Sequence, residues 1–306
     1  MTRRICLAVA AVLLLPTSSA AEGTTAVVAA KIETGGAPCG VVAGAGAMWV
    51  SNAADGTVVR VDPASNEVTA RVAVHHQPCG LAFAAGSLWV QTAAGVVERI
   101  DAATARVVAS VPVGRDSYDV QAGHGSVWVT NHADGTVTRI DPRTNRVRKT
   151  IRLPRGTKAA GLAITARHVW VGADATFAIY RIDPRTNRVL RVPTRRAGPA
   201  WFAAQPGSLW VANTGSDSIS RLNPITGATL ATVSVGKLPV DLELVNGELW
   251  VPNNRGDTIT RVDAASRAVV ETIAVGAQPI VIEAAFGDIW VTHFAGTDVW
   301  RIHPSP

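Results

Sequence analysis

The sequence has little of what several common protein classes require. Only three of its 306 residues are cysteines, too few for a fold held together by a disulfide framework. The single uninterrupted apolar run is short and lies near the N-terminus, so we expect no membrane span after processing. No stretch of about 10 to 12 residues repeats apolar residues at intervals of three and four, which disfavours amphipathic helices.

The motifs of several enzyme classes are also absent. The sequence contains no Gly-x-Ser-x-Gly nucleophile motif, no phosphate-binding glycine loop and no Cys-x-x-Cys pair. Common hydrolase and nucleotide-binding functions are therefore disfavoured. The formal charge of +6 comes from basic residues that recur at regular intervals along the chain, and this dispersed pattern predicts no nucleic-acid partner.

The first residues have the form of an export signal. A basic pair, Arg3-Arg4, precedes an apolar stretch over residues 5–15, and small residues follow it. These three parts predict a secretory signal peptide over residues 1–21. The basic pair also partly matches a twin-arginine signal, so the export route stays open. We expect a secreted or periplasmic protein with a single mature domain over residues 22–306.

A repeat of about 40 residues runs through the mature chain. Tryptophan followed by valine occurs seven times, at intervals of 39 to 42 residues. About ten residues after each tryptophan comes an arginine, an aliphatic residue and usually an aspartate. We expect both repeated residues to be structural, with each arginine pairing either with that aspartate or with a neighbouring blade. The repeat tryptophans are Trp49, Trp89, Trp128, Trp170, Trp210, Trp250 and Trp290.

Each copy contains four short segments in which apolar and polar residues alternate. In the second copy they are residues 80–84, 87–91, 95–101 and 106–111. Four strands in about 40 residues are typical of a β-propeller blade. The seven copies therefore predict an all-β protein, a seven-bladed β-propeller with four antiparallel strands per blade.

The two ends of the chain predict how the ring closes. The last copy ends after three strands, the third at residues 296–303. Near the N-terminus, Val28 and Ile32 repeat the spacing of Val269 and Ile273. We predict that this N-terminal segment is the outermost strand of the last blade, which removes two exposed sheet edges. Closure makes one cooperative domain, and we expect a monomer.

The repeat carries a family resemblance. The four residues from Trp128 to Asn131, Trp-Val-Thr-Asn, resemble the signature of the YVTN family of β-propeller repeats, and Trp-Val-x-Asn recurs in three other copies. The mature chain is also similar to the wider group of seven-bladed propellers that includes virginiamycin B lyase, a metal-assisted eliminase. That resemblance implies histidines at the start of the innermost strand in the last two blades, where this sequence has Val240 and Ile280.

Departures from the repeat mark the candidate ligand site, because features shared by every blade are structural. They gather near the start of the innermost strand, where most copies have small or apolar residues. Carboxylates there could hold a cation or a polar ligand group, and aromatic rings would supply apolar walls. Hydrogen bonding to channel water or to neighbouring backbone is the alternative role. The seven candidate ligand-binding residues are Tyr118, Asp119, Gln121, Trp201, Asp241, Glu243 and Glu283.

The two cysteines of the mature chain occupy equivalent positions in adjacent blades. Cys39 and Cys79 each follow a proline and precede a glycine at the start of an innermost strand. An exported protein can oxidise such a pair, and neighbouring innermost strands lie near the upper limit of bridging distance. We predict a disulfide between them, with two buried free thiols as the alternative.

The histidines do not group as metal ligands do. His75 and His76 are adjacent in the sequence, so in a strand their side chains point in opposite directions, and His132 and His293 lie in distant blades. We expect no zinc or copper site, no cofactor and no catalytic residues. The sequence favours a non-catalytic module that binds a small polar ligand or a protein partner at the channel mouth. The alternative is a virginiamycin B lyase-like or lactonase-like metal-assisted enzyme.

Overall fold

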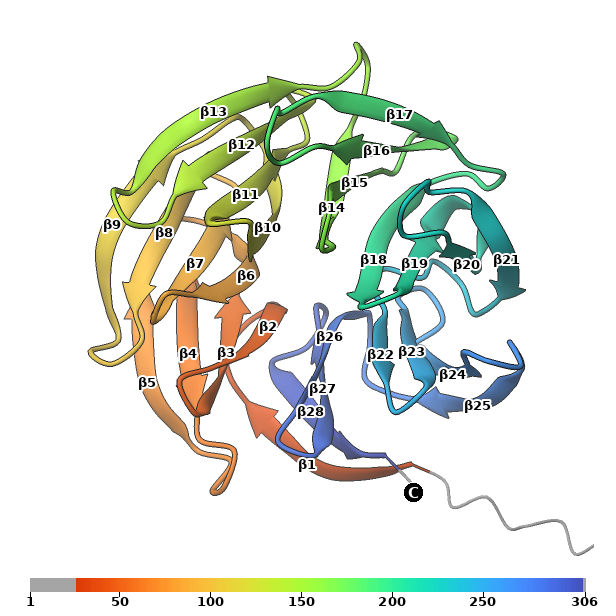
Figure 1. Ribbon diagram of the computed structural model, residues 1–306. Helices are drawn as coiled ribbons and strands as arrows, with labels where there is room; N and C mark the ends of the chain where they lie inside the picture. The colour runs from red at the N-terminus through yellow and green to blue at the C-terminus, as the bar shows by residue number, and fades with distance from the viewer. Residues whose placement is uncertain (1–25, 305–306) are drawn as a thin grey trace, which may run out of the picture.

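The computed structural model describes residues 26–304, and the predicted signal peptide lies outside this range. Its 28 strands form seven four-stranded antiparallel sheets, arranged around a ring as the blades of a propeller (Figure 1). The predicted seven-bladed propeller is thus confirmed. A short 3-10 segment, η1 (Thr214–Ser216), is the one helical element described, and no helix in residues 26–304 is long and apolar enough to span a membrane.

In each blade the chain enters along the innermost strand and then moves outward (Figure 1). The second strands carry the repeat tryptophans. The innermost strands are β2 (Pro38–Gly44), β6 (Pro78–Ala84), β10 (Ser117–Gly123), β14 (Ala159–Ile164), β18 (Pro199–Gln205), β22 (Glu243–Val245) and β26 (Pro279–Ala285). The second strands are β3 (Ala47–Asn52), β7 (Ser87–Thr92), β11 (Ser126–Asn131), β15 (Val169–Ala173), β19 (Ser208–Asn213), β23 (Glu248–Asn253) and β27 (Asp288–His293).

The outer half of each blade carries the repeat arginines and the most exposed strand. The third strands are β4 (Thr57–Val61), β8 (Val96–Asp101), β12 (Thr136–Asp141), β16 (Ala178–Ile182), β20 (Ser218–Leu222), β24 (Thr258–Asp263) and β28 (Asp298–His303). The outermost strands are β5 (Val68–Ala73), β9 (Arg106–Pro112), β13 (Arg146–Arg152), β17 (Val189–Pro193), β21 (Thr229–Ser234), β25 (Val269–Ala274) and β1 (Val27–Glu33).

The predicted closure is confirmed. Strand β1 pairs antiparallel with β28, and the last blade has the order β1-β28-β27-β26. Ile32 of β1 is 5% exposed and packs in the same core cluster as Val299 and Trp290. The N-terminal strand therefore covers the edge that β28 would otherwise expose.

The repeat tryptophans hold neighbouring blades together. Trp128 in the third blade packs against Leu162 and Val169 of the fourth, and Trp290 packs against Met48 of the first. All seven are at most 1% exposed. A fully buried aromatic removes about 150 to 250 Å² from water, which contributes on the order of 4 kcal/mol before entropy is counted. The structural role expected of these residues is confirmed.

The repeat arginines reach the next blade. The Arg139 guanidinium lies 4.7 Å from the Trp128 ring centroid and donates a hydrogen bond to Asn187 Oδ1 in the fourth blade at 3.1 Å. Arg99 and Arg301 make equivalent bonds to the next blade's turn. The aspartate two positions on accepts backbone N–H groups of its own turn. Arg99 and Arg139 therefore bond to the next blade and not to the aspartate two positions on, and Arg301 also bonds to the next blade.

Deletion of residues 22–35 tests the closure. Removing β1 exposes the edge of β28 and uncovers the core around Val299, so we expect a strong fall in melting temperature and in solubility. Thermal melts and the soluble fraction after expression would measure this. The substitution Glu33→Gln, on an exposed position of the same strand, is the control and should leave both unchanged. Unchanged melting and solubility after the deletion would contradict closure by β1.

Candidate functional site

The innermost strands surround a central cavity of about 400 Å³. Strand β10 supplies three of the predicted residues, β18 and β26 supply one each, and two come from β22 and the segment before it. The structure thus brings all the candidate side chains from four blades to one cavity. Its lining includes Tyr118, Asp119, Gln121, Trp201, Asp241, Glu243 and Glu283.

Asp119 joins the third and fourth blades at the axis. Its Oδ2 accepts a hydrogen bond from the Leu162 backbone N–H at 2.7 Å, and its Oδ1 accepts one from Val120 at 2.7 Å. The residue is only 8% exposed. Burial raises the pKa of Asp119 to about 7, although both hydrogen bonds act in the opposite direction. Asp119 therefore has a structural partner while it also lines the cavity.

Asp241 plays the matching role between the last two blades. Its Oδ2 accepts a hydrogen bond from the Ile282 backbone N–H at 3.0 Å. Burial raises the pKa of this carboxyl well above its usual value, and the nearby Glu243 and Asp119 raise it further. The two aspartates lie about 120 residues apart in the sequence. Each accepts a backbone hydrogen bond from the innermost strand of the next blade.

The backbone around Asp241 is irregular. Strand β22 has three residues, whereas the other innermost strands have six or seven. In the adjoining β23, Pro252 has no N–H to donate, and only its carbonyl takes part, accepting a bond from Val240 at 3.2 Å. Asp241 therefore projects from a segment that the sheet holds less tightly than the equivalent residue in other blades.

Two glutamates lie deeper on the same wall. Glu283 Oε1 accepts a hydrogen bond from the Ala43 backbone N–H of the first blade at 3.3 Å, and burial raises its pKa to about 7. Burial, together with repulsion from Glu283, raises the pKa of Glu243 to about 8. Within residues 26–304 the structure records no hydrogen bond to the Glu243 carboxyl. Glu243 is therefore the cavity carboxyl that is most available to a ligand.

The mouth of the channel is apolar and aromatic. A second cavity of about 500 Å³ is lined by Ile280, Phe294 and the rings of Tyr118 and Trp201. The two rings stack with centroids 5.6 Å apart. Tyr118, Trp201 and Ile280, together with Cys79, line both the mouth and the central cavity. The apolar mouth therefore opens directly into the carboxyl-lined cavity.

His132 lies beside the mouth, against Tyr118, and the sequence did not mark it as a ligand-binding residue. Its Nδ1 lies 3.0 Å from Asp116 Oδ2, its Nε2 lies 3.3 Å from Asp174 Oδ2, and its ring stacks on Tyr118 at 5.0 Å. It follows Asn131, at the end of Trp-Val-Thr-Asn, and the equivalent residues Ala53, Ala93 and Phe294 line the mouth. His293, by contrast, is fully buried against Trp300.

A disulfide joins Cys39 of β2 to Cys79 of β6, with Cα atoms 4.9 Å apart. The Cys39 carbonyl accepts a hydrogen bond from Thr292, and the Cys79 carbonyl accepts one from Ser51, both at 2.7 Å. Gly40 is required beside this bond, because a Cβ there would collide with the Cys79 carbonyl. Both cysteines line the apolar mouth.

The positions implied for lyase histidines do not provide metal ligands. Val240 and Ile280 both line the central cavity, where their side chains are apolar. Across residues 26–304, no group of three histidine, cysteine, aspartate or glutamate side chains has an arrangement that could hold a metal ion. The residues present therefore do not fit a metal centre of the kind that the lyase resemblance implies.

Similarity to solved structures defines the class of this protein as a seven-bladed propeller of virginiamycin B lyase-like fold. A streptogramin B lyase structure matches with a TM-score of 0.80 and 15% identity, over 90% of this chain and 96% of that one. Virginiamycin B lyase from Staphylococcus aureus matches with a TM-score of 0.79 and 15% identity, over 90% and 98%. The resemblance expected from the sequence is thus confirmed for the fold, which is all that such low identity shows.

Other comparisons give no activity. Hydrazine synthase from Kuenenia stuttgartiensis is similar in fold, with a TM-score of 0.78 and 13% identity over 89% of this chain and 97% of that one. Residues 120–216 match a family described as a repeat of unknown function (DUF6923). No curated protein matches the chain. Different proteins therefore share this fold, so the fold does not identify the function, which has to be argued from the site.

The intact mass of the protein after alkylation tests whether the disulfide forms. Cys39 and Cys79 are the only cysteines in residues 22–306, and the structure joins them. We expect denatured, unreduced mature protein to take up no alkylating reagent, and reduced protein to take up two groups. Uptake of two groups without reduction would contradict the bond.

The pH dependence of stability tests the buried carboxyls. A carboxyl whose pKa is raised by folding binds more protons in the folded than in the unfolded protein at pH values between its unfolded and folded pKa. The free energy of unfolding therefore falls as the pH rises through that range. For Glu243 the range runs from its usual pKa of 4.5 to about 8. We expect Glu243→Gln to raise the melting temperature at about pH 9 and to raise it much less at about pH 4.

The control for this experiment is Glu67→Gln, at an exposed turn of the first blade. Its effect on the melting temperature should be small at both pH values, because that side chain is solvated. An equal effect of Glu243→Gln at both pH values would show that the Glu243 carboxyl is not buried in its neutral form.

Proposed function

We propose that this protein is an exported, non-catalytic binding module that recognises a small polar ligand at the mouth of the propeller channel. The observation that carries the proposal is the direct passage from an aromatic mouth into a cavity lined with carboxyls. Tyr118 and Trp201 line both spaces, so one molecule can contact the rings and the carboxyls together.

The ligand binds with its apolar part against the stacked rings of Tyr118 and Trp201. Its cationic or hydrogen-bonding group lies towards Glu243 and Glu283, because a positive charge close to a buried carboxyl favours the ionised form. Asp119 and Asp241 accept hydrogen bonds from the next blade and fix the shape of the cavity. Gln121 offers both donor and acceptor groups on the same wall.

Export is supported by two features of the chain. Residues 1–21 have the three-part form of a signal peptide. The disulfide between Cys39 and Cys79 is of a kind that persists in oxidising compartments and is rare in the cytosol. We place the mature protein outside the cytoplasm, secreted or periplasmic, as a monomer.

An enzyme of the lyase or lactonase type is the second candidate, supported by fold similarity to streptogramin B lyase and by the carboxyls with pKa values near neutrality. Against it stand Val240 and Ile280, apolar where the resemblance implies histidines. Metal-dependent turnover that is lost in Glu243→Gln or Glu283→Gln would favour the enzyme over the binding module.

A thermal-shift screen of small cations, metal ions and metabolites tests the binding module. We expect stabilising ligands whose effect disappears in Trp201→Ala and Asp241→Ala, because both residues line the cavity. Cationic hits should stabilise more at about pH 9 than at about pH 6, since the carboxyls are then ionised. The control is Phe177→Ala, an aromatic residue 60% exposed that lines neither cavity. Hits that persist in both cavity variants would place the site elsewhere.

A further inference from the structure

The positive charge of this protein is concentrated on one side of the ring. Residues 143–196, which contain β13 to β17, hold 12 arginines and two lysines but only two aspartates. The rest of the sequence has 15 basic and 21 acidic residues. The basic residues do recur along the whole chain, but the net charge is not evenly dispersed as expected. Residues 143–196 contain few acidic residues, so most of their positive charge is not balanced.

For most of these basic side chains the structure records no partner in residues 26–304. Arg148 pairs with Asp141 at 2.6 Å, and Arg181 donates to the Ile225 carbonyl. For the other twelve, the structure records no side-chain hydrogen bond or ion pair within residues 26–304. All twelve are exposed. They are Arg143, Arg146, Lys149, Arg152, Arg155, Lys158, Arg167, Arg185, Arg188, Arg191, Arg195 and Arg196.

The exposed basic residues of the third and fourth blades form what we call the basic face. Strands β13 and β17 are the outermost strands of adjacent blades and lie next to each other on the rim (Figure 1). Arg143 precedes β13 and Arg155 follows it, so the charge extends along the whole strand. The hydrogen bond from Arg139 to Asn187 draws the fourth blade's basic turn against the third blade.

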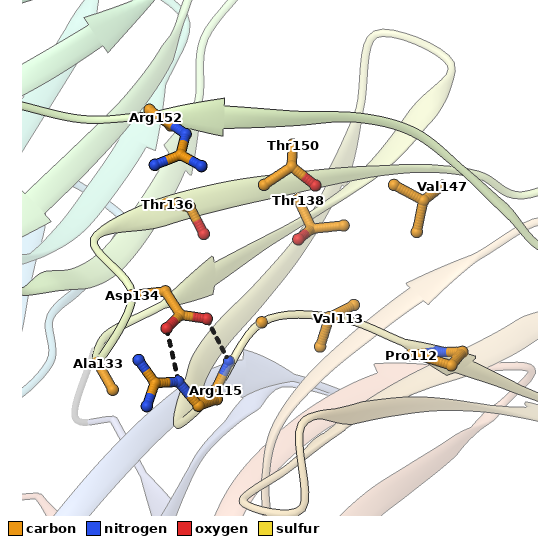
Figure 2. Close-up of a pocket in the computed structure, with 11 residues that line it drawn as sticks. Pro112, Val113, Arg115, Ala133, Asp134, Thr136, Thr138, Val147, Thr150 and Arg152 are labelled. Atoms are coloured by element: carbon orange, nitrogen blue, oxygen red, sulfur yellow. Dashed lines mark hydrogen bonds and ion pairs between the residues drawn. The ribbon is translucent and has the colours of Figure 1, made fainter.

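A polar groove runs beside β13. It has a volume of about 560 Å³, and hydroxyl groups of Thr136 and Thr150 face it together with Arg152 (Figure 2). Arg115 and Asp134, paired at 2.8 Å, lie at its other end. A second hollow of about 470 Å³ shares Asp134 and Arg152 with the groove and adds the basic side chains of the following loop. The groove therefore combines hydroxyls, a carboxylate and cations.

We propose that the groove and the basic face bind an acidic polysaccharide, a linear glycan that carries sulfate or carboxylate groups. Arginine guanidinium groups bind such anions through paired N–H donors. The hydroxyl of Thr150 can donate to or accept from a sugar hydroxyl, and the carboxylate of Asp134 can accept a hydrogen bond from one. A linear chain matches the shape of this surface, since the charge follows an extended strand at the rim.

Other polyanions fit these observations less well. In residues 143–196 the one exposed large aromatic side chain is Phe177, and single-stranded nucleic acids are bound by several stacking aromatics. Insertion into a membrane surface through an amphipathic helix requires such a helix, whereas these basic residues follow a curved rim of strands (Figure 1). A glycan, in contrast, can bind both the basic side chains and the threonine hydroxyls of the groove.

Binding to heparin and to polygalacturonate, at several salt concentrations, tests the proposal. The variant Arg152→Gln/Arg155→Gln/Lys158→Gln removes one charge from the groove and two from the adjoining hollow. We expect affinity about tenfold weaker with a shallower salt dependence. The matched control Arg71→Gln/Arg106→Gln/Arg255→Gln removes three exposed charges from other blades. It should change affinity less than about threefold. Equal losses in the two triple variants would overturn the proposal.

A variant without charge change separates a glycan from other polyanions. Thr150→Val removes one groove hydroxyl, and we expect glycan affinity to fall about threefold while duplex DNA binding is unchanged. Unchanged glycan affinity in this variant would contradict the proposal. So would wild-type binding to DNA or to anionic phosphatidylglycerol vesicles as tight as to heparin at the same salt. Glu243→Gln should retain full heparin binding, which separates this surface from the channel site.

Discussion

The fold depends on one packing contact that is repeated around the ring. In it a tryptophan from the second strand of one blade fills the space against the next blade, as Trp128 does against Leu162. An arginine covers the ring and bonds to the next blade's turn, as Arg139 does to Asn187. Because each contact needs two blades, no single blade can bury its own tryptophan. Ring closure by β1 is therefore part of the stability of every interface, since the last blade buries Trp290 against the first.

At the start of the innermost strands some blades approach closely, and Gly40 and Gly161 lie where a Cβ would collide with the next blade. Where Asp119 and Asp241 replace such a glycine, each carboxylate accepts an N–H from the next blade. The hydrogen bonds offset part of the cost of burial, but the pKa of Asp119 still reaches about 7. The same carboxyls thus hold the ring together and give the channel its chemistry. Because the pKa of Asp119 is about 7, its protonation responds to small changes in what occupies the cavity.

The scaffold is sevenfold, but the chemistry is not. Acidic groups lie at the axis, aromatic rings at the mouth, and unpaired arginines on the rim of the third and fourth blades. Each set occupies positions that vary between copies, so none disturbs the contact that builds the ring. When the channel carboxyls are ionised they repel an anionic polymer, so the two proposed sites differ in the charge of the ligand that they favour.

The sequence by itself determined the blade number, the strand order and the closure, because alternation within strands and a period of about 40 residues are local signals. It also distinguished the axial residues that depart from the repeat, such as Tyr118 and Glu243. Only the tertiary structure decided that Asp119 bonds to Leu162, that His132 stacks on Tyr118, and that Pro252 leaves β22 short. Each of these contacts joins different strands or the turns that follow them, and the one between Asp119 and Leu162 also joins two blades. Side chains distant in the sequence meet there at distances that the folded ring sets and no local pattern encodes.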